Sequence, residues 1–455
     1  MASTDHSLDA DPISLPPLQD RAEAALSAAK AAGADAADAV ASASLERSIT
    51  VRNGKNEDVE SAESVGLTLR IFVGARSAMV GVSPRGDLAE AAARAVTMAK
   101  AAPEDEAVGL AAPDQLASHW AALDLDDAQM PSSHDLESQA RRIEHFMLAE
   151  PGVMNSGGAS ASATRAGRWL ATSNGFSAGY ASSLHVMSAT AIAGGGTAME
   201  RDSWYSARRH MAELEDAVTI GKTAAHRAVK RLNAERISTR TATVVFEPAA
   251  ASGFVRHLLS AANGSAVARQ STFLAGKLGE LIYPNAITVR DDPTIVRGMA
   301  SRPFDGEGLS AGALDIVSDG VLSVYLLDLA SARRLSMAPN GRASRGGGSP
   351  TPGPTNVTVS GGAGDMASLM AEAGEGFLVT DLIGMGADLV SGAYSRGAAG
   401  FWFKNGEIVH PVAEVTIAGD LADMFRRARF ADDAPGRYSV DAPSVALEGM
   451  TIGGS

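Results

Sequence analysis

Nine histidines and the absence of cysteine limit the metal chemistry that this chain could carry out. A metallopeptidase helix needs two histidines about one turn apart, so that both imidazoles face one metal ion, with a glutamate between them as the base. No two histidines in the sequence lie within one helical turn of each other. Without cysteine, thiolate nucleophiles, disulfides, iron–sulfur clusters and thiolate zinc ligands are also excluded. Only a metal site assembled from distant histidines and carboxylates stays open.

Two acidic residues, Asp305 and Glu307 in the segment PFDGEG, could act as a general acid and base or bind a cation. Acidic pairs flanked by glycine in a turn are more often solvated, and we expect that of this pair. The sequence has no Gly-x-Ser-x-Gly elbow, and neither a phosphate-binding loop nor a dinucleotide fingerprint lies between a predicted strand and helix. Nucleophilic and nucleotide chemistry therefore lack a recognisable motif.

The composition narrows the class of protein further. A chain of 455 residues is too long for one ordinary core, so we expect two domains. The net charge of −14 argues against wide contact with nucleic acid, which requires a basic face. No segment offers the ~18 consecutive apolar residues of a membrane span. Residues 1–15 have neither a basic start nor an apolar run, so the sequence predicts no secretory signal and a cytoplasmic location.

The first half of the chain predicts helices packed on a sheet. An Ala-rich helix is predicted over 18–32, strands over 40–52 and 66–73 with a hairpin turn at Asn53-Gly54, and a helix over 87–101. The order of one helix, three extended segments and one helix indicates an α+β layer.

The chain then becomes rich in strands. A helix is predicted over 133–150 with Ser133 as its N-cap, then long strands over 155–199 that turn at Asn174-Gly175, then a helix over 213–232.

We therefore predict an α+β protein with two domains: an N-terminal helix-and-sheet domain (1–232) and a β-rich, barrel-like C-terminal domain (241–455). The second domain opens with a strand over 242–246 and contains one short helix near 249–262, closed by Asn263-Gly264. Its loop 340–356 is rich in Gly and Pro and is longer than most connectors, which favours a functional role.

The chain resembles the TldD/TldE (PmbA) family of peptidases, specifically the TldE side. The resemblance covers nearly the whole chain, and its most specific segments are APED (102–105), RDSWYS (201–206), SRPFDGEG (301–308), ASRGGGSPTPGPTN (343–356), DLIGMG (381–386), GAYSRGAAGFW (392–402) and PVAEVTIAGDLADMF (411–425). The family's active subunit is a zinc peptidase with His-Glu-x-x-x-His on the first helix of its C-terminal domain and a late cysteine ligand. In this sequence the resemblance puts Val255 and Ser260 at the two histidine positions and Arg256 at the glutamate. It therefore implies an inactive chain without a metal site or cofactor, and zinc in a partner subunit.

The resemblance further implies a heterodimer with a TldD-like catalytic subunit, whose shared chamber admits unfolded or small peptides for degradation or maturation. We expect the Gly-rich loops to let a peptide backbone approach closely. The candidate peptide-binding residues are Arg342, Ser344, Arg345, Asn356, Tyr394 and Arg396. Some members carry the label "modulator of DNA gyrase", but nothing in this acidic chain supports contact with gyrase or DNA.

Two alternatives stay open. The chain could be a stand-alone homodimeric hydrolase with a non-zinc or dispersed metal site. The best candidate residues for such a site are Asp305, Glu307, His410 and Glu414. It could also be a structural β-rich protein of the cell surface, although the missing signal sequence speaks against this.

Overall fold

A computed structural model describes residues 13–454 of the chain. The start of the chain, where the sequence predicts no secretory signal, falls mainly outside these residues. Among residues 13–454, no helix combines the length and the apolar character needed to cross a lipid bilayer.

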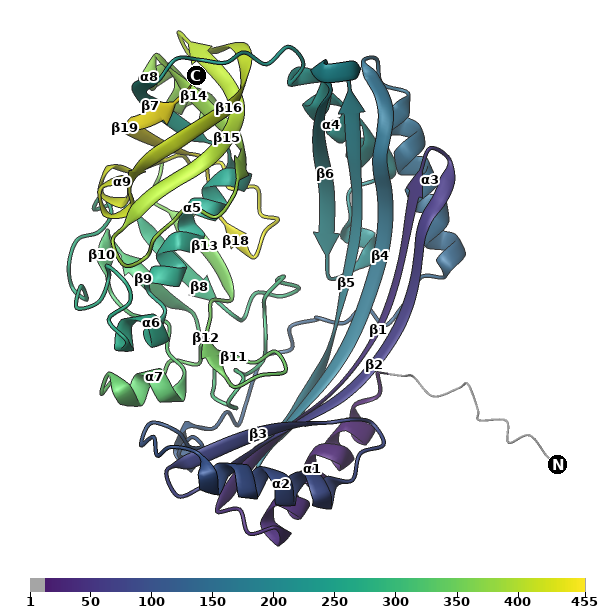
Figure 1. Cartoon of the computed structure of the whole chain (residues 1–455), viewed down its shortest axis with the longest axis vertical. Helices are drawn as coiled ribbons and strands as arrows, with labels where there is room; N and C mark the ends of the chain where they lie inside the picture. The colour runs from purple at the N-terminus through teal and green to yellow at the C-terminus, as the bar shows by residue number, and fades with distance from the viewer. Residues whose placement is uncertain (1–12, 455) are drawn as a thin grey trace, which may run out of the picture.

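A long antiparallel sheet forms the first half of the molecule (Figure 1). Its six strands lie in the order β3-β2-β1-β4-β5-β6. The strands are long meanders of Ala, Ser, Thr and Gly, whose alternating burial gives the sheet two different faces. Their bounds are β1 Ala36–Arg52, β2 Lys55–Val73, β3 Arg76–Val82, β4 Val153–Thr172, β5 Ser177–Ala193 and β6 Glu200–Arg208.

Four helices cover the outer face of this sheet (Figure 1). Helices α1 (Leu15–Ala31) and α2 (Leu88–Ala101) pack on one end of the sheet, and α3 (Ser133–Leu148) and α4 (Ala217–Lys230) pack on the other. The predicted helices and hairpin are confirmed. The predicted cap of α3 is wrong, because Ser132 caps the helix and forms a capping box with Asp135, one position earlier than expected.

The second half of the molecule contains a closed barrel. Strands β16-β15-β14-β7-β19 form a ring that the pairing of β16 with β19 completes, and β17 (Arg429–Phe430) extends its edge. The barrel strands are β7 Arg240–Phe246, β14 Glu375–Ile383, β15 Ala393–Lys404, β16 Glu407–Asp420 and β19 Val445–Gly453. The predicted α+β class, with a barrel in the C-terminal region, is confirmed. The division into two folding units, 1–232 and 241–455, stays a prediction.

A second sheet and several short segments complete this half. The sheet has the order β10-β9-β8-β13-β18. Its strands are β8 Thr288–Asp292, β9 Leu314–Ser318, β10 Val321–Leu322, β13 Asn356–Ser360 and β18 Val440–Asp441. Inside the loop 340–356, β11 (Ala343–Ser344) pairs with β12 (Thr351–Pro352). Short 3-10 turns lie at Pro113–Gln115, Gly196–Ala198 and Met211–Glu213.

The predicted helix near 249–262 is confirmed as α5 (Pro248–Ala261), but the prediction that it is the single helix of the C-terminal half is wrong. Asn263 does not close α5 in a turn; its side chain accepts hydrogen bonds from Ser265 and Ala266 and caps a new helix. The further helices are α6 Gly264–Ala268, α7 Leu329–Arg334, α8 Met366–Ala373 and α9 Leu421–Arg427.

The core of the C-terminal half depends on aromatic packing between the barrel and α5. Phe246 and Phe254 stack with ring centroids 6.3 Å apart, and Phe254 packs edge-on against Phe425 at 5.1 Å. All three side chains are buried. This contact fixes α5 against the barrel wall.

We predict that Phe246→Ala destabilises the C-terminal half by about 3–5 kcal/mol, because it removes a fully buried ring and leaves a cavity. Urea unfolding followed by far-UV circular dichroism measures the effect. Val59→Ala on β2, where the side chain is 58% exposed, is the control and should change stability by less than about 0.5 kcal/mol. Equal midpoints for the two variants would contradict the packing argument.

Candidate functional site

The three positions that the sequence singled out on α5 do not share a cavity. Val255 is fully buried in the barrel core, whereas Arg256 and Ser260 are exposed. Residues five apart on a helix differ by about 140° in direction, so the inward direction of Val255 turns Ser260 outward. The Nη2 atom of Arg256 lies 3.5 Å from the Ser439 hydroxyl.

These side chains do not fit a zinc ion. Zinc in proteins takes three or four nitrogen, sulfur or carboxylate ligands that converge on one point. The α5 positions offer an isopropyl group, a guanidinium and a hydroxyl. Across residues 13–454, no group of three His, Asp or Glu side chains is arranged to hold a metal ion.

Two of the predicted peptide-binding residues lie beside α5. Tyr394 is buried, and its ring packs edge-on against His257 with centroids 5.7 Å apart. Burial raises the pKa of Tyr394 to about 12, and burial together with the nearby Arg396 lowers the pKa of His257. Arg396 donates a hydrogen bond to the Leu382 carbonyl at 3.3 Å. The α5 face therefore carries a neutral phenol, a neutral imidazole and a cation.

Two other predicted residues, Arg342 and Asn356, are structural anchors. Arg342 is completely enclosed and pairs with Asp291, and its Nη2 donates to the Gly312 carbonyl. Asn356 donates to the Ser301 hydroxyl at 2.7 Å. A peptide could not touch Arg342 in this structure without displacing Asp291. A Gly- and Pro-rich segment suggests an exposed arginine, but Arg342 is buried.

The last two predicted peptide-binding residues, Ser344 and Arg345, are adjacent in the chain but differ in burial. Ser344 is exposed, but Arg345 is 4% exposed and reaches the long sheet, where its Nη1 lies 2.7 Å from Asp38 Oδ1. Asp38 stands directly opposite Arg70 in the β1–β2 register and accepts a hydrogen bond from its Nε at 2.8 Å. Residues 38 and 70 lie on the inner face of the sheet, and the loop covers them.

Asp305 and Glu307 lie beside Asp38, Arg70 and Arg345, and we call these five residues the charged cluster. The expectation that the two acidic residues are solvated is wrong. Both are buried, and their carboxylates accept hydrogen bonds from backbone N–H groups, including Leu309 to Asp305 and Leu329 to Glu307. Glu307 Oε1 also lies 3.6 Å from Arg70 Nη2. They hold the loops together where the two halves meet.

Burial and ion pairing shift the pKa values of these carboxyls in opposite directions. Burial raises the pKa of Glu307 to about 8, although Arg70 opposes the shift. Burial also raises the pKa of Asp305. Burial alone would raise the pKa of Asp38, but Arg70 and Arg345 outweigh it and hold that pKa below its usual range. Asp38 is thus the permanent negative charge of the cluster.

The other two residues of the stand-alone hydrolase hypothesis lie apart from this cluster, on β16. His410 Nδ1 is 3.7 Å from Glu235, and Glu414 forms an exposed ion pair with Arg236. The structure therefore places two of the four residues in the charged cluster and the other two on β16, where they contact the segment that links the two halves.

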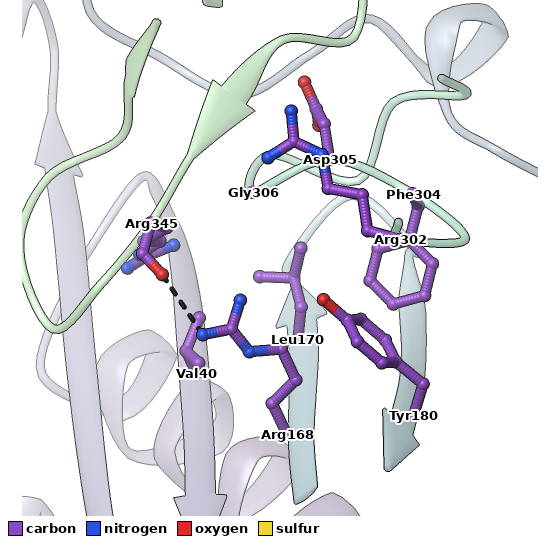
Figure 2. Close-up of a pocket in the computed structure, with 9 residues that line it drawn as sticks. All are labelled: Val40, Arg168, Leu170, Tyr180, Arg302, Phe304, Asp305, Gly306 and Arg345. Atoms are coloured by element: carbon purple, nitrogen blue, oxygen red, sulfur yellow. Dashed lines mark hydrogen bonds between the residues drawn. The ribbon is translucent and has the colours of Figure 1, made fainter. Parts of the chain in front are cut away.

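A narrow pocket opens above the charged cluster (Figure 2). We call it the interdomain pocket, because strands β1, β4 and β5 form one wall and C-terminal segments form the other. It is lined by Val40, Arg168, Leu170, Tyr180, Arg302, Phe304, Asp305, Gly306 and Arg345. Sequence reasoning missed its sheet residues. A charge such as Arg70 inside the apolar strand GLTLRIFV was the available signal.

A wider cleft of ≈480 Å³ lies between β6, α4 and the start of α5. Arg227 joins its walls by pairing with Asp202 of β6 at 3.2 Å and with Glu247, the residue before α5, at 2.8 Å. Arg437 stacks 4.2 Å above the Trp204 ring. The segment RDSWYS therefore forms the N-terminal wall of a cleft whose other wall is the C-terminal half.

Comparison with known proteins identifies the class. Family models match along the chain: PmbA/TldA metallopeptidase domain 1 at residues 37–99, the central domain at 122–232 and the C-terminal domain at 239–454. The fold and these matches define a metallopeptidase-like protein with all three domains of that architecture. The chain belongs to the PmbA/TldD/TldE family.

Individual relatives agree with this assignment. The chain is 33% identical to metalloprotease PmbA of Escherichia coli O157:H7, with 92% of each chain covered. It is 34% identical to the PmbA homologue of Haemophilus influenzae, with 95% of each covered. Both relatives are named PmbA, which is compatible with the TldE side of the family.

Solved structures share the fold. A Bacteroides thetaiotaomicron protein described as a candidate modulator of DNA gyrase superposes with a TM-score of 0.89 at 25% identity, covering 97% of this chain and 99% of that one. TldE from Thermococcus kodakarensis superposes with a TM-score of 0.83 at 20% identity, covering 95% and 99%.

We predict that Glu307→Gln flattens the pH dependence of stability. The pKa of Glu307 rises from its ordinary 4.5 to about 8 in the folded chain, so the folded state binds the extra proton between these values. Its contribution is therefore fully present below about pH 4.5 and is lost as the pH rises to about 8, at up to ~1.4 kcal/mol per pH unit. Gln mimics the neutral acid and should remove this slope.

Denaturant unfolding of the wild type and the variant between these pH values measures the difference. Glu60→Gln, on the exposed part of β2, is the control and should keep the wild-type slope. A variant slope identical to that of the wild type would show that Glu307 ionises normally.

Proposed function

We propose that this chain is the non-catalytic TldE-type subunit of a cytoplasmic heterodimeric zinc metallopeptidase, in which a TldD-like partner supplies the metal. Its role is to form one side of a chamber that admits unfolded proteins and small peptides for degradation or maturation. The observation that carries the proposal is the chemistry of α5. Where the family's active subunit has metal ligands and a base, this helix has a core valine, an exposed arginine and an exposed serine.

The electrostatics of the α5 face support the same role. A guanidinium at position 256 repels a divalent cation, and Arg396 places a second positive charge beside His257 of the same helix. The same cations suit the carbonyl oxygens of a peptide backbone, which accept hydrogen bonds from guanidinium groups.

The cleft and the loop support a chamber wall. The cleft of ≈480 Å³ separates the RDSWYS segment from α5, and its size falls within the range of protein ligand sites. Gly346, Gly347 and Gly348 have no heavy atom within 4 Å of an added Cβ, so open space surrounds this part of the loop. A peptide backbone can approach such a segment closely.

We predict that peptide hydrolysis appears only when this chain is mixed with a relative that bears His-Glu-x-x-x-His. The active species should be a dimer that buries more than about 1,000 Å², the usual size of a specific interface. A chelator should abolish the activity by removing the partner's zinc without unfolding this chain. Size-exclusion chromatography with a fluorogenic peptide assay measures both. Chelator-resistant hydrolysis by the pure chain would refute the proposal in favour of the stand-alone hydrolase.

We also predict that the triple variant Val255→His, Arg256→Glu, Ser260→His does not gain activity alone. The new imidazole at position 255 would point into the barrel core, and no cysteine is present to act as the late ligand. Burying a polar ring there should instead cost stability by about 1–3 kcal/mol. Elemental analysis, a peptidase assay and a thermal melt test this. One zinc per chain together with hydrolysis would show that the missing side chains alone made the site inactive.

A further inference from the structure

The interdomain pocket contains more cations than close anionic partners. Arg168 comes from β4, and Arg302 and Arg345 come from the C-terminal half. Within residues 13–454, neither Arg168 nor Arg302 forms a close ion pair with a carboxylate, and Arg345 shares Asp38 with Arg70. Asp305 also lines the pocket, but its carboxylate already accepts hydrogen bonds from three backbone N–H groups.

Several guanidinium donors in the pocket lack an acceptor. The Nε atom of Arg302 and the Nε and Nη2 atoms of Arg345 are enclosed and have no hydrogen-bond partner in the part of the chain that the structure describes. Arg168 uses its Nη2 for the Arg345 carbonyl at 3.3 Å, the contact drawn in Figure 2. Buried donors without acceptors are costly, so an incoming anionic oxygen would be stabilised here.

The walls around these cations are apolar and aromatic. Tyr180 stands directly opposite Arg168 in the β4–β5 register, and its ring packs edge-on against Phe304 with centroids 5.5 Å apart. Val40 and Leu170, also cross-strand neighbours, add aliphatic side chains to the same pocket (Figure 2). Such a pocket suits a planar carboxylate attached to a short carbon chain, because arginine pairs with carboxylates through two parallel hydrogen bonds.

The pocket continues into a shallow hollow of ≈390 Å³ along the inner face of the sheet. The two share Val40, Arg168 and Arg345. The rest of the hollow is lined mainly by small side chains from β1 to β3 and by one glycine of the loop, namely Ser42, Gly66, Leu67, Thr68, Gly81, Val82, Ser83 and Gly347. An extended chain could lie over this floor with its end at the arginines.

We propose that the interdomain pocket binds a carboxylate group of a peptide that lies along this hollow, with Arg168 as its principal ligand. The carboxylate is either the C-terminus of the peptide or an Asp or Glu side chain. The proposal rests on the proposed function, because it assigns a recognition site to the chamber. Arg345 and Arg302 complete the cationic wall, and Tyr180 and Phe304 contact the carbon atoms next to the carboxylate.

Fluorescence polarisation with the purified full-length chain tests this. Three labelled, unstructured peptides of one sequence without acidic residues are compared: a free acid, a C-terminal amide, and an amide with one internal Glu. We expect the free acid to bind about tenfold or more tightly than the plain amide. If the Glu-containing amide binds like the free acid, the pocket accepts side-chain carboxylates; if it binds like the plain amide, the pocket reads the C-terminus. Both results support the proposal.

Arg168→Gln should weaken binding of the free acid about tenfold or more and leave the amide unchanged, since Arg168 is half-buried and outside any close ion pair. Arg168→Lys should restore part of the affinity, because the charge returns without the planar fork. Arg52→Gln, at the far end of the same sheet, removes one charge from an exposed ion pair with Glu57 and is the matched control. Circular dichroism and thermal melts verify that all variants fold.

Equal affinity for all three peptides, no measurable binding of any of them, or an unchanged affinity in Arg168→Gln would overturn the proposal. Hydrolysis of the amidated peptide by the mixed subunits separates the two proposals. If it proceeds while acid and amide bind equally, the chamber role stands and the carboxylate site fails. If acid-selective binding is found without hydrolysis in the mixture, the site stands and the peptidase role fails.

Discussion

The relation between the two halves of this molecule depends on one buried carboxylate. Asp38 lies near the start of β1, an interior strand of the long sheet, is 1% exposed, and pairs with Arg70 of the neighbouring strand and Arg345 of the C-terminal loop. A buried charge without partners is strongly unfavourable, so the sheet requires the loop to close over it. The loop has the same requirement, because Arg345 is itself buried. Each half thus satisfies a charge that the other half leaves incomplete, and the interdomain pocket exists because this closure brings several arginines to the inner face of the sheet.

The same closure gives the loop 340–356 two different parts. Arg342 pairs with Asp291 and Asn356 hydrogen-bonds with Ser301, so both ends are fixed inside the C-terminal half. Arg345 fixes the loop to the sheet. Between these anchors, the glycines 346–348 stand in open space. A long loop of this composition is therefore a positioned element with a short adaptable segment, which is the arrangement expected of a surface that must admit variable peptides.

Much of the fold could be predicted from the sequence, because its long elements have strong local signals. The hairpin at Asn53-Gly54, the alternation along 155–199 and the apolar face of 249–262 each depend on near neighbours in the chain. The short helices α6 to α9 were missed because five to eight residues are too few to show a helical period. The site was harder to predict for a different reason. The burial of Asp38 and Arg345 depends on a contact between residues 307 positions apart. No local sequence pattern near either residue predicts this contact. The arginines of a Gly- and Pro-rich loop look exposed in sequence, and only the tertiary contacts show that Arg342 and Arg345 are enclosed.

Helix α5 shows why such a subunit can lose a metal site and keep its fold. One side of the helix packs Phe254, Val255 and Leu258 into the barrel, and that contact stabilises the whole C-terminal half. The opposite side carries Arg256 and Ser260, which contribute little to packing. Because each residue turns the helix by about 100°, positions 256 and 260 lie away from the packing face and can change without loss of the core, whereas position 255 lies on the packing face and is filled by an apolar side chain. The outward face carries the cation Arg256, and three arginines line the interdomain pocket, although the chain as a whole carries a net charge of −14. Positive groups therefore gather where the two halves meet, and there they suit the carbonyl oxygens and carboxylates of a peptide and disfavour a divalent metal ion.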